Sequence, residues 1–417
     1  MLIEFSVANF RSFNKIQSVS FRATALVSED KAIDTKNIVE VSEIRLLKTV
    51  GVYGPNASGK SNIVKAIRLY REMISFSMIS EDLTQLVADP FKLSTEEMSN
   101  AGFFQSVILL DEKKYRYGFT LSKEGNVQEE WLFGTAEKNE TYYFKRKDQK
   151  IEINSERFPE GVDNPLEKLR PNALFLSFCS SFNGPISGSI RRFFHHDVFI
   201  EGKAEGRVKD NISYRIPYWR TNQLIEHGNK HIVLDWMNEI GLFYNDVLLE
   251  RSQLKETVIN DVLFIKNKYN QKREPAGTSF MRLNEESDGT QKFYSFIGEL
   301  QEKFDKGGLY ICDEIDSNFH PTLLQHLIRI FNNNLINRSN AQLLFTSHDT
   351  NLMDPSIMRR DQFYFTEKSE QDETILYSLS DLKGIRNNAD FARQYLAGFY
   401  GALPSLGNYL ESSNPQN

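Results

Sequence analysis

Eight residues near the start of the chain constrain its fold more than any other segment. They read Gly54-Pro55-Asn56-Ala57-Ser58-Gly59-Lys60-Ser61 and match a glycine-rich phosphate-binding loop at each fixed position. An apolar run, Leu46 to Val52, precedes the loop, and a helical pattern from Lys60 to about Met78 follows it. In such a strand–loop–helix unit, backbone N–H groups and the helix N-terminus surround a phosphate group. The segment therefore predicts a nucleotide-binding α/β domain.

The side chains of this loop, the Walker A motif, have separate expected roles. Lys60 would reach the β- and γ-phosphates, and the Ser61 hydroxyl would bind Mg²⁺. A glycine-rich turn without a ligand is the alternative, and the flanking strand and helix disfavour it. The predicted nucleotide-binding residues here are Gly54, Pro55, Asn56, Ala57, Ser58, Gly59, Lys60, Ser61 and Asn62.

A second motif lies late in the chain, where the apolar run Leu309 to Cys312 ends in two acids, Asp313 and Glu314. This is the Walker B form, in which Asp313 holds the Mg²⁺ shell and Glu314 acts as general base on the attacking water. Alone, such a run is more often a strand that meets an exposed turn. Its position after a Walker A motif favours the catalytic interpretation.

A histidine follows the next strand-like run, Gln342 to Thr346. At a strand end His348 is by itself more often a surface residue. Because it follows the two Walker motifs in the right order, we expect it to contact the γ-phosphate and orient water. The predicted catalytic residues are thus Lys60, Glu314 and His348.

The segment Ser287-Asp288-Gly289-Thr290-Gln291 leads into a helical run, Lys292 to Phe304. A serine and a glycine at a helix start favour anion binding, and a plain helix N-cap is the compatible alternative. The segment resembles the signature motif of ABC ATPases, LSGGQ, which reaches across a dimer to the γ-phosphate held by the opposite protomer. Asp288 stands where that motif has its first glycine.

Further segments extend the resemblance. Asn9-Phe10-Arg11-Ser12-Phe13 is similar to the N-terminal segment of the RecF, Rad50 and SMC group of ABC ATPases. The chain more closely resembles the RloA/AbiL-like and OLD-like bacterial ATPases associated with phage defence. That likeness rests on Glu286 to Gln291, on Asp313-Glu314 with Phe319-His320-Pro321, on Thr346 to Thr350, and on Tyr395 to Pro404. It covers about 130 residues at the start and about 140 at the end.

The resemblance implies further site residues. Arg11 and Ser12 would lie near the nucleotide, and Ser287, Asp288, Gly289 and Gln291 would act in trans on the nucleotide of a partner protomer. The D-loop at the dimer seam would contain Asp316, Ser317, Asn318 and His320, although many ABC proteins have an aspartate in place of His320. Gln105 is the candidate for the Q-loop glutamine that contacts the metal. The implied ligands are ATP and Mg²⁺, and the implied partner is a second copy of the chain.

The pattern of elements predicts an ABC-type α/β head, with a mixed sheet flanked by helices and an antiparallel β meander. The meander is expected from Phe103 to Leu110, Tyr115 to Leu121 and Val127 to Phe133. Residues 1–136 and 280–417 would form the two parts of the head. Residues 137–279 would form a mainly helical insertion without the sustained heptads of a coiled-coil arm.

Composition limits the remaining classes of function. Two distant cysteines, the lack of an apolar stretch near 20 residues, and a start without signal-peptide features predict a cytoplasmic protein outside the membrane. The net charge of −6 gives no overall drive toward nucleic acid, which would need a local patch. Basic-aromatic segments such as Lys268 to Arg273 are such patches, although these are more often solvated surfaces.

Two hypotheses follow for the function. In the first, ATP-dependent dimerisation and hydrolysis control a separate effector, such as a Toprim-like nuclease, in anti-phage abortive infection. The short segment after His348 leaves no room for that nuclease in the chain as given. In the alternative, the chain is a RecF- or Rad50-like DNA-repair ATPase that binds DNA directly. A scaffold that binds ATP without hydrolysis is disfavoured by the intact Lys60, Asp313, Glu314 and His348, and a transport subunit by the altered signature.

Overall fold

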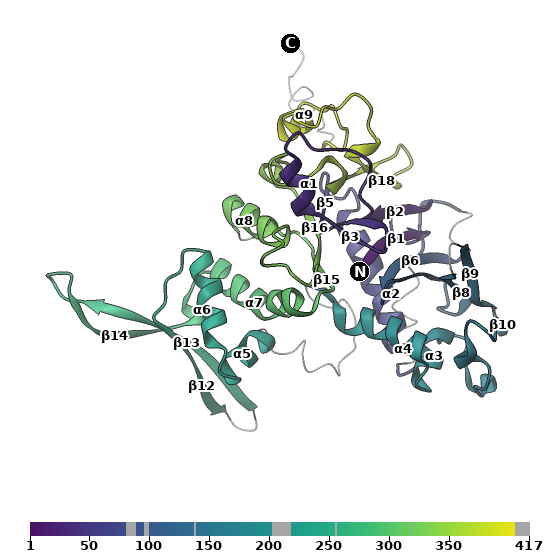
Figure 1. Ribbon diagram of the computed structural model, residues 1–417, viewed down its shortest axis with the longest axis horizontal. Helices are drawn as coiled ribbons and strands as arrows, with labels where there is room; N and C mark the ends of the chain where they lie inside the picture. Colours follow the sequence, from purple (N-terminus) through teal and green to yellow (C-terminus); the bar gives the residue numbers. More distant parts are fainter. Residues whose placement is uncertain are drawn as a thin grey trace, which may run out of the picture.

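Two large sheets with a helix between them form the body of the protein (Figure 1). The computed structural model describes residues 1–80, 89–95, 100–136, 139–201, 218–254, 257–317 and 319–404. The predicted D-loop residue Asn318 lies outside these described residues. Among them, no helix is both long enough and apolar enough to cross a membrane.

The first sheet is the parallel core expected around the phosphate-binding loop. Its order is β11-β15-β16-β5-β17-β18, and every neighbouring pair is parallel except β17 with β18. Its strands are β5 (Thr49–Tyr53), β11 (Val198–Ile200), β15 (Leu309–Cys312), β16 (Gln342–Ser347), β17 (Phe363–Lys368) and β18 (Thr374–Ser378). The carboxyl ends of β5, β15 and β16 therefore share one edge, where ligands bind in open α/β sheets.

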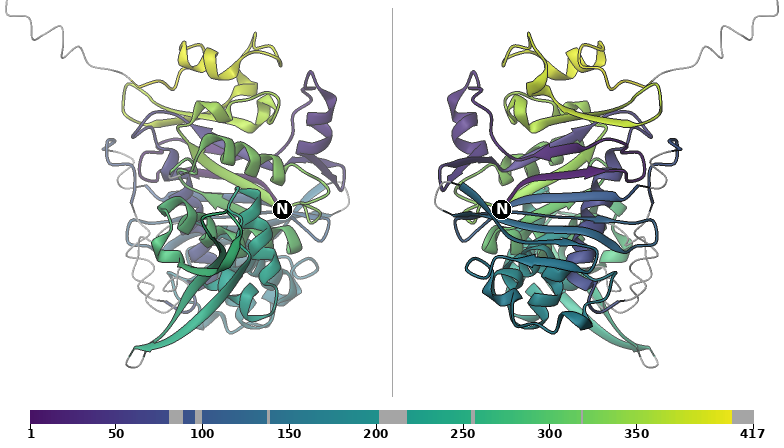
Figure 2. Two further views of the ribbon diagram at one scale, coloured as in Figure 1. Left: turned by 90° about the vertical axis from the view of Figure 1, so that its left-hand side faces the viewer. Right: turned by 90° about the vertical axis from the view of Figure 1, so that its right-hand side faces the viewer.

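The second sheet is antiparallel and contains the predicted meander, which is confirmed. Its order is β10-β9-β8-β7-β6-β1-β2, and Figure 2 shows several of its strands side by side. The strands are β1 (Leu2–Ala8), β2 (Gln17–Ser20), β6 (Gly102–Leu110), β7 (Lys113–Leu121), β8 (Val127–Ala136), β9 (Asn139–Lys147) and β10 (Lys150–Ile153).

Helix α2 (Lys60–Phe76) packs between the two sheets. Its Tyr70 ring stacks on Phe119 of β7 at 5.2 Å, and its apolar face shares a core with Val50 and Val52 of β5. The opposite face of the parallel sheet packs against helices α7 (Asp288–Lys306) and α8 (Pro321–Phe331). Because both faces are covered, strands β5, β15 and β16 are buried along their whole length, in agreement with their largely apolar sequences.

The central segment is mixed rather than mainly helical. The expected helices are α3 (Phe175–Ser181), α4 (Pro185–Arg192), α5 (Trp219–Glu226) and α6 (Lys230–Glu239). Strands β9 and β10 from the same segment extend the antiparallel sheet, and β11 pairs with β15 in the parallel core. The predicted boundary at 136/137 therefore falls between two strands, β8 and β9, that pair with each other in one antiparallel sheet.

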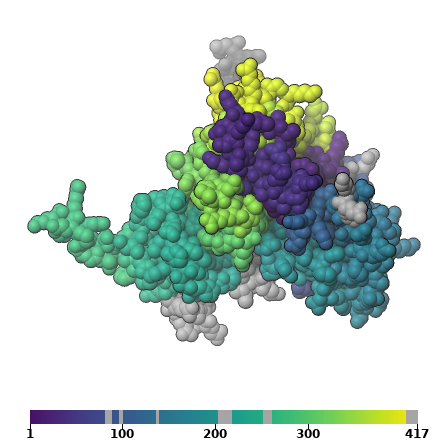
Figure 3. Space-filling model, viewed as in Figure 1, coloured from purple at the N-terminus to yellow at the C-terminus, as the bar shows by residue number. Residues whose placement is uncertain are grey.

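The remaining part of that segment projects from the body as an arm (Figures 1 and 3). The arm is a three-stranded antiparallel sheet of β12 (Asp246–Leu254), β13 (Thr257–Tyr269) and β14 (Pro275–Arg282). At its base Phe264 stacks on Tyr244 at 4.1 Å between ring centroids. The sequence of this segment lacks the heptads of a coiled coil, and the arm that its described residues form is built from β-strands.

A smaller correction concerns the run Leu46 to Val52, which is two strands rather than one. Strand β4 (Ile44–Leu47) pairs with β3 (Ile38–Val41), and the chain then turns at Lys48 into β5. The Lys48 side chain is buried and donates to Asn334, and burial lowers its pKa to about 8. The other helices are α1 (Lys31–Asn37) and α9 (Phe391–Leu396).

Candidate nucleotide-binding site

The Walker A loop has the backbone that its two flanking glycines permit. Gly54 has φ 151° and Gly59 has φ 112°, conformations that disfavour residues with a Cβ. A Cβ on Gly54 would also collide with the Thr366 carbonyl, and one on Gly59 with the Thr374 side chain. The loop is therefore packed closely against Thr366 of β17 and Thr374 of β18, which support its curved shape.

Lys60 spans this loop from the first turn of α2. Its Nζ donates to the carbonyls of Gly54 at 2.8 Å and Pro55 at 2.9 Å. Burial lowers its pKa to about 8, although Asp313, Asp316 and Glu314 act in the opposite direction. The ammonium group thus sits beside three acids within a loop shaped for phosphate, and phosphate oxygens could replace the two carbonyls as its partners.

The two Walker motifs meet through hydrogen bonds. The Ser61 hydroxyl donates to Asp313 Oδ1 at 3.1 Å, and the Thr346 hydroxyl donates to the same oxygen at 2.6 Å. The backbone N–H of Glu314 donates to Thr346 Oγ1 at 2.7 Å. One chain of contacts therefore connects α2, β15 and β16, which lie far apart in the sequence.

Asp313 and Ser61 also fit Mg²⁺ by their chemistry. A carboxylate and a hydroxyl already in contact are the hard oxygen ligands that this ion prefers, with most remaining positions left to water and phosphate. Among the described residues, no cluster of three or more His, Cys, Asp or Glu side chains offers a different kind of metal site.

Glu314 and His348 stand at neighbouring strand ends. Glu314 has φ 52°, an uncommon conformation for a non-glycine residue, and its side chain is exposed. His348 is also exposed, and its backbone N–H donates to Asp316 Oδ2 at 3.1 Å. Both residues therefore face the open edge of the sheet, where a nucleotide would be reached.

The predicted D-loop lies next to this edge and is tied to helix α7. Lys292 Nζ donates to the carbonyl of Ser317 at 2.9 Å and to its hydroxyl at 2.5 Å. His320 instead caps helix α8, where its Nδ1 accepts from the Thr322 N–H at 3.3 Å. The cap gives His320 a structural role in the isolated chain.

The signature-like segment forms the start of α7. Ser287 is the N-cap, and its hydroxyl accepts from the Thr290 N–H at 3.2 Å. Gln291 donates from its side chain to the Glu286 carbonyl at 2.9 Å. Ser287 and Asp288 are exposed, with Gly289 beside them half-buried, so this helix start is open at the surface. The N-cap prediction is confirmed, and the helix start can be approached by another molecule.

Arg11, Ser12 and Asn62 lie around the Walker A loop in different ways. The Ser12 hydroxyl accepts from Asn62 Nδ2 at 2.7 Å and lies 2.7 Å from the Thr374 hydroxyl, whose own proton is donated to the Ser58 carbonyl. Arg11 forms an ion pair with Asp89 at 3.4 Å. Ser12 and Asn62 therefore help to hold the Walker A loop against β18. Arg11 lies beside the loop, where it is paired with Asp89.

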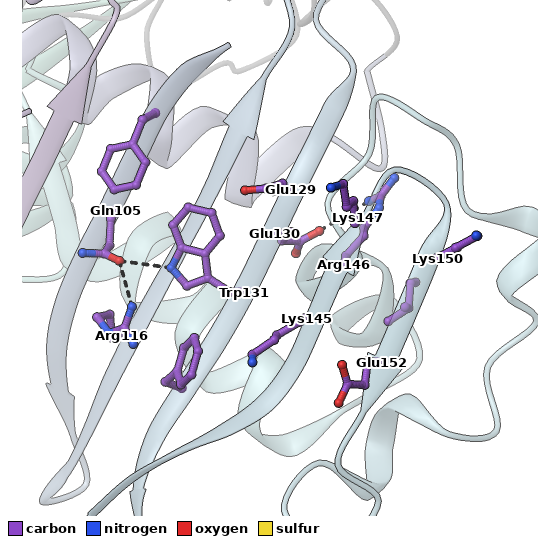
Figure 4. A pocket seen from close by; sticks show the side chains of 13 residues that line it. Gln105, Arg116, Glu129, Glu130, Trp131, Lys145, Arg146, Lys147, Lys150 and Glu152 are labelled. Atoms are coloured by element: carbon purple, nitrogen blue, oxygen red, sulfur yellow. Dashed lines mark hydrogen bonds and ion pairs between the residues drawn. The ribbon is translucent and has the colours of Figure 1, made fainter. Parts of the chain in front are cut away.

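Gln105 lies away from the loop, on the face of the antiparallel sheet opposite α2. Its Oε1 accepts from Arg116 at 3.2 Å and from Trp131 at 3.1 Å, as Figure 4 shows. It lines an open cavity of about 660 Å³ on that outer face. The structure does not bring Gln105 to Ser61, so it gives no support to the predicted metal contact.

Three threonines contribute to the site but belong to none of the sequence motifs. Thr346 bridges the Walker B acids, Thr366 contacts Ser58 at 2.6 Å, and Thr374 donates to the Ser58 carbonyl at 2.7 Å. Thr346 could have been suspected because it ends the strand before His348. Thr366 and Thr374 could not, because only the folded sheet brings β17 and β18 to the loop.

Comparison with known families matches this arrangement. A family model described as "AAA domain, putative AbiEii toxin, Type IV TA system" matches residues 50–354. The chain belongs to this AAA domain family. The match runs from the strand before the Walker A loop to just beyond His348. Together with the sheet order and the site, it establishes the fold as an ABC-type P-loop ATPase head.

Solved structures similar to this AAA domain include heads of SMC proteins. One is an SMC head bound to the C-winged helix domain of ScpA, at 13% identity and a TM-score of 0.48, covering 92% of this chain and 99% of that one. Another, from Thermotoga maritima, has 11% identity and a TM-score of 0.42, with coverage of 90% and 98%. A third, from Pyrococcus furiosus, has 12% identity and a TM-score of 0.44, with coverage of 95% and 99%. No curated protein matches the chain significantly.

Proposed function

We propose that this chain is an ATPase whose head closes on a second copy of itself around bound ATP, and that hydrolysis releases the two copies. The observation that carries the proposal is the contact chain from Ser61 through Asp313 and Thr346 to Glu314. It fixes a candidate metal-binding hydroxyl, a candidate metal-binding carboxylate and a candidate base relative to one another. Such prior positioning is how phosphoryl-transfer enzymes lower their barriers.

Each residue then has a role in the hydrolysis. Lys60 exchanges its carbonyl partners for phosphate oxygens and neutralises charge on the β- and γ-phosphates. Glu314 accepts a proton from the water that attacks the γ-phosphorus, as the bond to the β–γ bridging oxygen breaks. His348 contacts the γ-phosphate from the adjacent strand end. Ser61 and Asp313 would hold Mg²⁺, which supplies charge neutralisation between the phosphates.

The exposed start of α7 supports the dimer. In a two-fold dimer, Ser287 of one protomer would face the Walker A loop of the other and donate to its γ-phosphate. The positive end of the helix dipole favours that anion. The negative charge of Asp288 repels the γ-phosphate. The ATP-bound dimer should therefore be weaker than it would be with a glycine at this position, and the two protomers should separate more readily.

We further propose that this cycle controls a separate effector in anti-phage defence. The description of the matched family names a toxin of a toxin–antitoxin system, and the motif resemblance to phage-defence ATPases agrees with it. The proposed partner is a Toprim-like nuclease, which would supply the destructive chemistry.

The dimer can be tested with the Glu314→Gln variant, which should bind ATP without hydrolysing it. Light scattering coupled to size exclusion should then show a dimer with ATP and Mg²⁺ and a monomer without nucleotide. Adding Ser287→Ala should weaken this dimer at least about 100-fold, because two symmetric contacts to a charged group are lost at about 1.5 to 3 kcal/mol each. Glu314→Gln protein that stays monomeric with saturating ATP would contradict the proposal.

Asp390→Ala provides the matched control for Ser287→Ala. Asp390 is the N-cap of α9, and its side chain accepts from the Arg393 N–H at 2.9 Å. Removing either cap costs about 1 kcal/mol of stability. Only the Ser287 substitution should affect the dimer, so equal effects would mean that the loss comes from destabilisation and would count against a contact in trans.

A further inference from the structure

The outer part of the β12–β14 arm, residues 266–279, differs in charge from the rest of the chain. It contains Lys266, Lys268, Lys272 and Arg273 against the single acid Glu274, so its net charge is +3, whereas that of the whole chain is −6. Positive charge is therefore concentrated on the element that projects farthest from the body (Figure 3). Separation of this kind favours a polyanionic ligand.

The cations at the end of the arm are also available for binding. Lys268, Lys272 and Arg273 are exposed, and within the described part of the chain none of them forms an ion pair with a carboxylate. By contrast, Lys266 lies over the Tyr244 ring at 4.5 Å, nearer the base of the arm. Three charges at the end thus remain without a structural role in the isolated chain.

The turn that carries these cations is ordered by one side chain. Asn270 Oδ1 accepts from the backbone N–H groups of Lys272 at 2.9 Å and Glu274 at 3.0 Å, and its amide donates to the Glu274 carboxylate at 2.9 Å. These bonds also occupy the one acid of the segment. Lys272 and Arg273 are therefore presented on a defined turn, which lowers the entropic cost of binding.

The shape of the arm selects among polyanions. Strand β12 pairs with β13 only as far as Ile265, so beyond that residue β13 and β14 continue as a two-stranded ribbon. In this ribbon β13 contributes four residues, Lys266 to Tyr269, which extend about 13 Å at about 3.3 Å per residue. A two-stranded ribbon is marginally stable alone, and it fits the major groove of B-form DNA, which is about 12 Å wide.

We propose that the ribbon of residues 266–279 docks on duplex DNA, with Lys268, Lys272 and Arg273 on its phosphates. This binding goes beyond the nucleotide-dependent dimer. It assigns the DNA contact to a local element, despite the acidic charge of the whole chain. Because the major groove of A-form RNA is deep and narrow, duplex RNA should bind much more weakly.

The test compares three proteins by fluorescence anisotropy with a labelled DNA duplex of about two helical turns. They are the unaltered chain, the arm variant Lys268→Ala/Lys272→Ala/Arg273→Ala, and the control variant Lys113→Ala/Lys147→Ala/Lys150→Ala. The control removes three exposed cations at turns of the antiparallel sheet. The arm variant should lose at least tenfold in affinity, and the slope of log affinity against log salt should fall by about 2 to 3. The control should stay within about twofold.

Several outcomes would overturn the proposal: no duplex binding by the unaltered chain, equal losses in both variants, or equal affinity for duplex RNA and duplex DNA. Tighter binding of single-stranded DNA than of the duplex would do the same. ATP-dependent dimerisation of the arm variant is measured in parallel. This measurement distinguishes a failure of DNA binding from a failure of the proposed ATPase cycle. An arm variant that dimerises normally but no longer binds DNA supports both.

Discussion

The nucleotide site and the arm use polar residues in opposite ways. At the site, polar side chains bind one another: Asp313 Oδ1 accepts from both Ser61 and Thr346, and Lys60 bonds to two carbonyls of its own loop. On the arm, Lys268, Lys272 and Arg273 are exposed and lie beyond the packed base. A preorganised site pays its ordering cost during folding, whereas an exposed charged ribbon gains its contacts only when a partner arrives.

This contrast implies that hydrolysis and duplex binding are separable by mutation. Lys60→Ala should lower kcat/KM for ATP by about 100- to 1,000-fold, because the loop loses the charge that faces the phosphates. The arm variant should keep kcat/KM within about twofold in the absence of DNA. Phosphate release under steady-state conditions measures both. A comparable loss in the arm variant would show that the two regions are not independent.

A smaller change tests whether the hydrogen bonds that connect Ser61, Asp313, Thr346 and Glu314 contribute to hydrolysis as well as to stability. Thr346→Val keeps the shape of a fully buried side chain but removes the bridge between Asp313 and the Glu314 N–H. One lost hydrogen bond to a charged group costs about 1.5 to 3 kcal/mol, so kcat should fall about 10- to 100-fold. Single-turnover hydrolysis at saturating ATP measures this step.

Thr221→Val is the control for that substitution. Thr221 is also fully buried, and its hydroxyl donates to the Tyr294 carbonyl at 2.8 Å and accepts from the Gly298 N–H at 3.0 Å. Both variants should be destabilised to a similar degree, but only Thr346→Val should slow hydrolysis. If kcat falls equally in both, the Thr346 bridge contributes through folding alone.

The same contrast explains what could be predicted from the sequence. Lys60, Asp313 and His348 could be predicted as site residues because each follows a strand in a fixed order, and parallel strands bring such positions to one edge. Thr366 and Thr374 were missed because their contacts with the Walker A loop join residues about 300 positions apart, which no local pattern records.

The arm was missed for a different reason. Its strands alternate weakly, and the exposed ribbon of β14 has no buried face to impose a period of two. Lys268 to Arg273 were visible as a basic segment, but their meaning depends on where the fold puts them. A charge cluster becomes informative once it is known to project from the body without acidic partners.

The pH dependence of ATP binding should distinguish Lys60 from a similar lysine elsewhere. Burial lowers the pKa of Lys60 to about 8, and phosphate groups bound beside it should raise that value. Below pH 8 the amine is already protonated and binding takes up no proton. Above pH 8 binding takes up a proton, so affinity should fall by up to about tenfold per pH unit. Calorimetry in buffers of different ionisation enthalpy measures the uptake.

Lys48 supplies the comparison, since burial gives it a pKa of about 8 as well. It precedes β5, whereas the Walker A loop follows the same strand, so the two lysines lie at opposite ends of β5. Lys48→Met should therefore leave the proton uptake unchanged. Loss of the uptake in that variant would assign the proton to Lys48 and contradict the predicted role of Lys60.

The smallest expected effect concerns the turn of the arm. Asn270→Ala removes the bonds to Lys272, Glu274 and the Glu274 carboxylate, but the turn is exposed and touches no core. The free energy of unfolding should change by less than about 0.5 kcal/mol, and kcat for ATP should not change. Affinity for the DNA duplex should still fall about two- to threefold, because Lys272 and Arg273 lose their fixed presentation. Asn267→Ala, in the same ribbon but outside the turn, is the matched control. If both substitutions reduce affinity equally, the turn does not preorganise the cations, and the arm binds through charge alone.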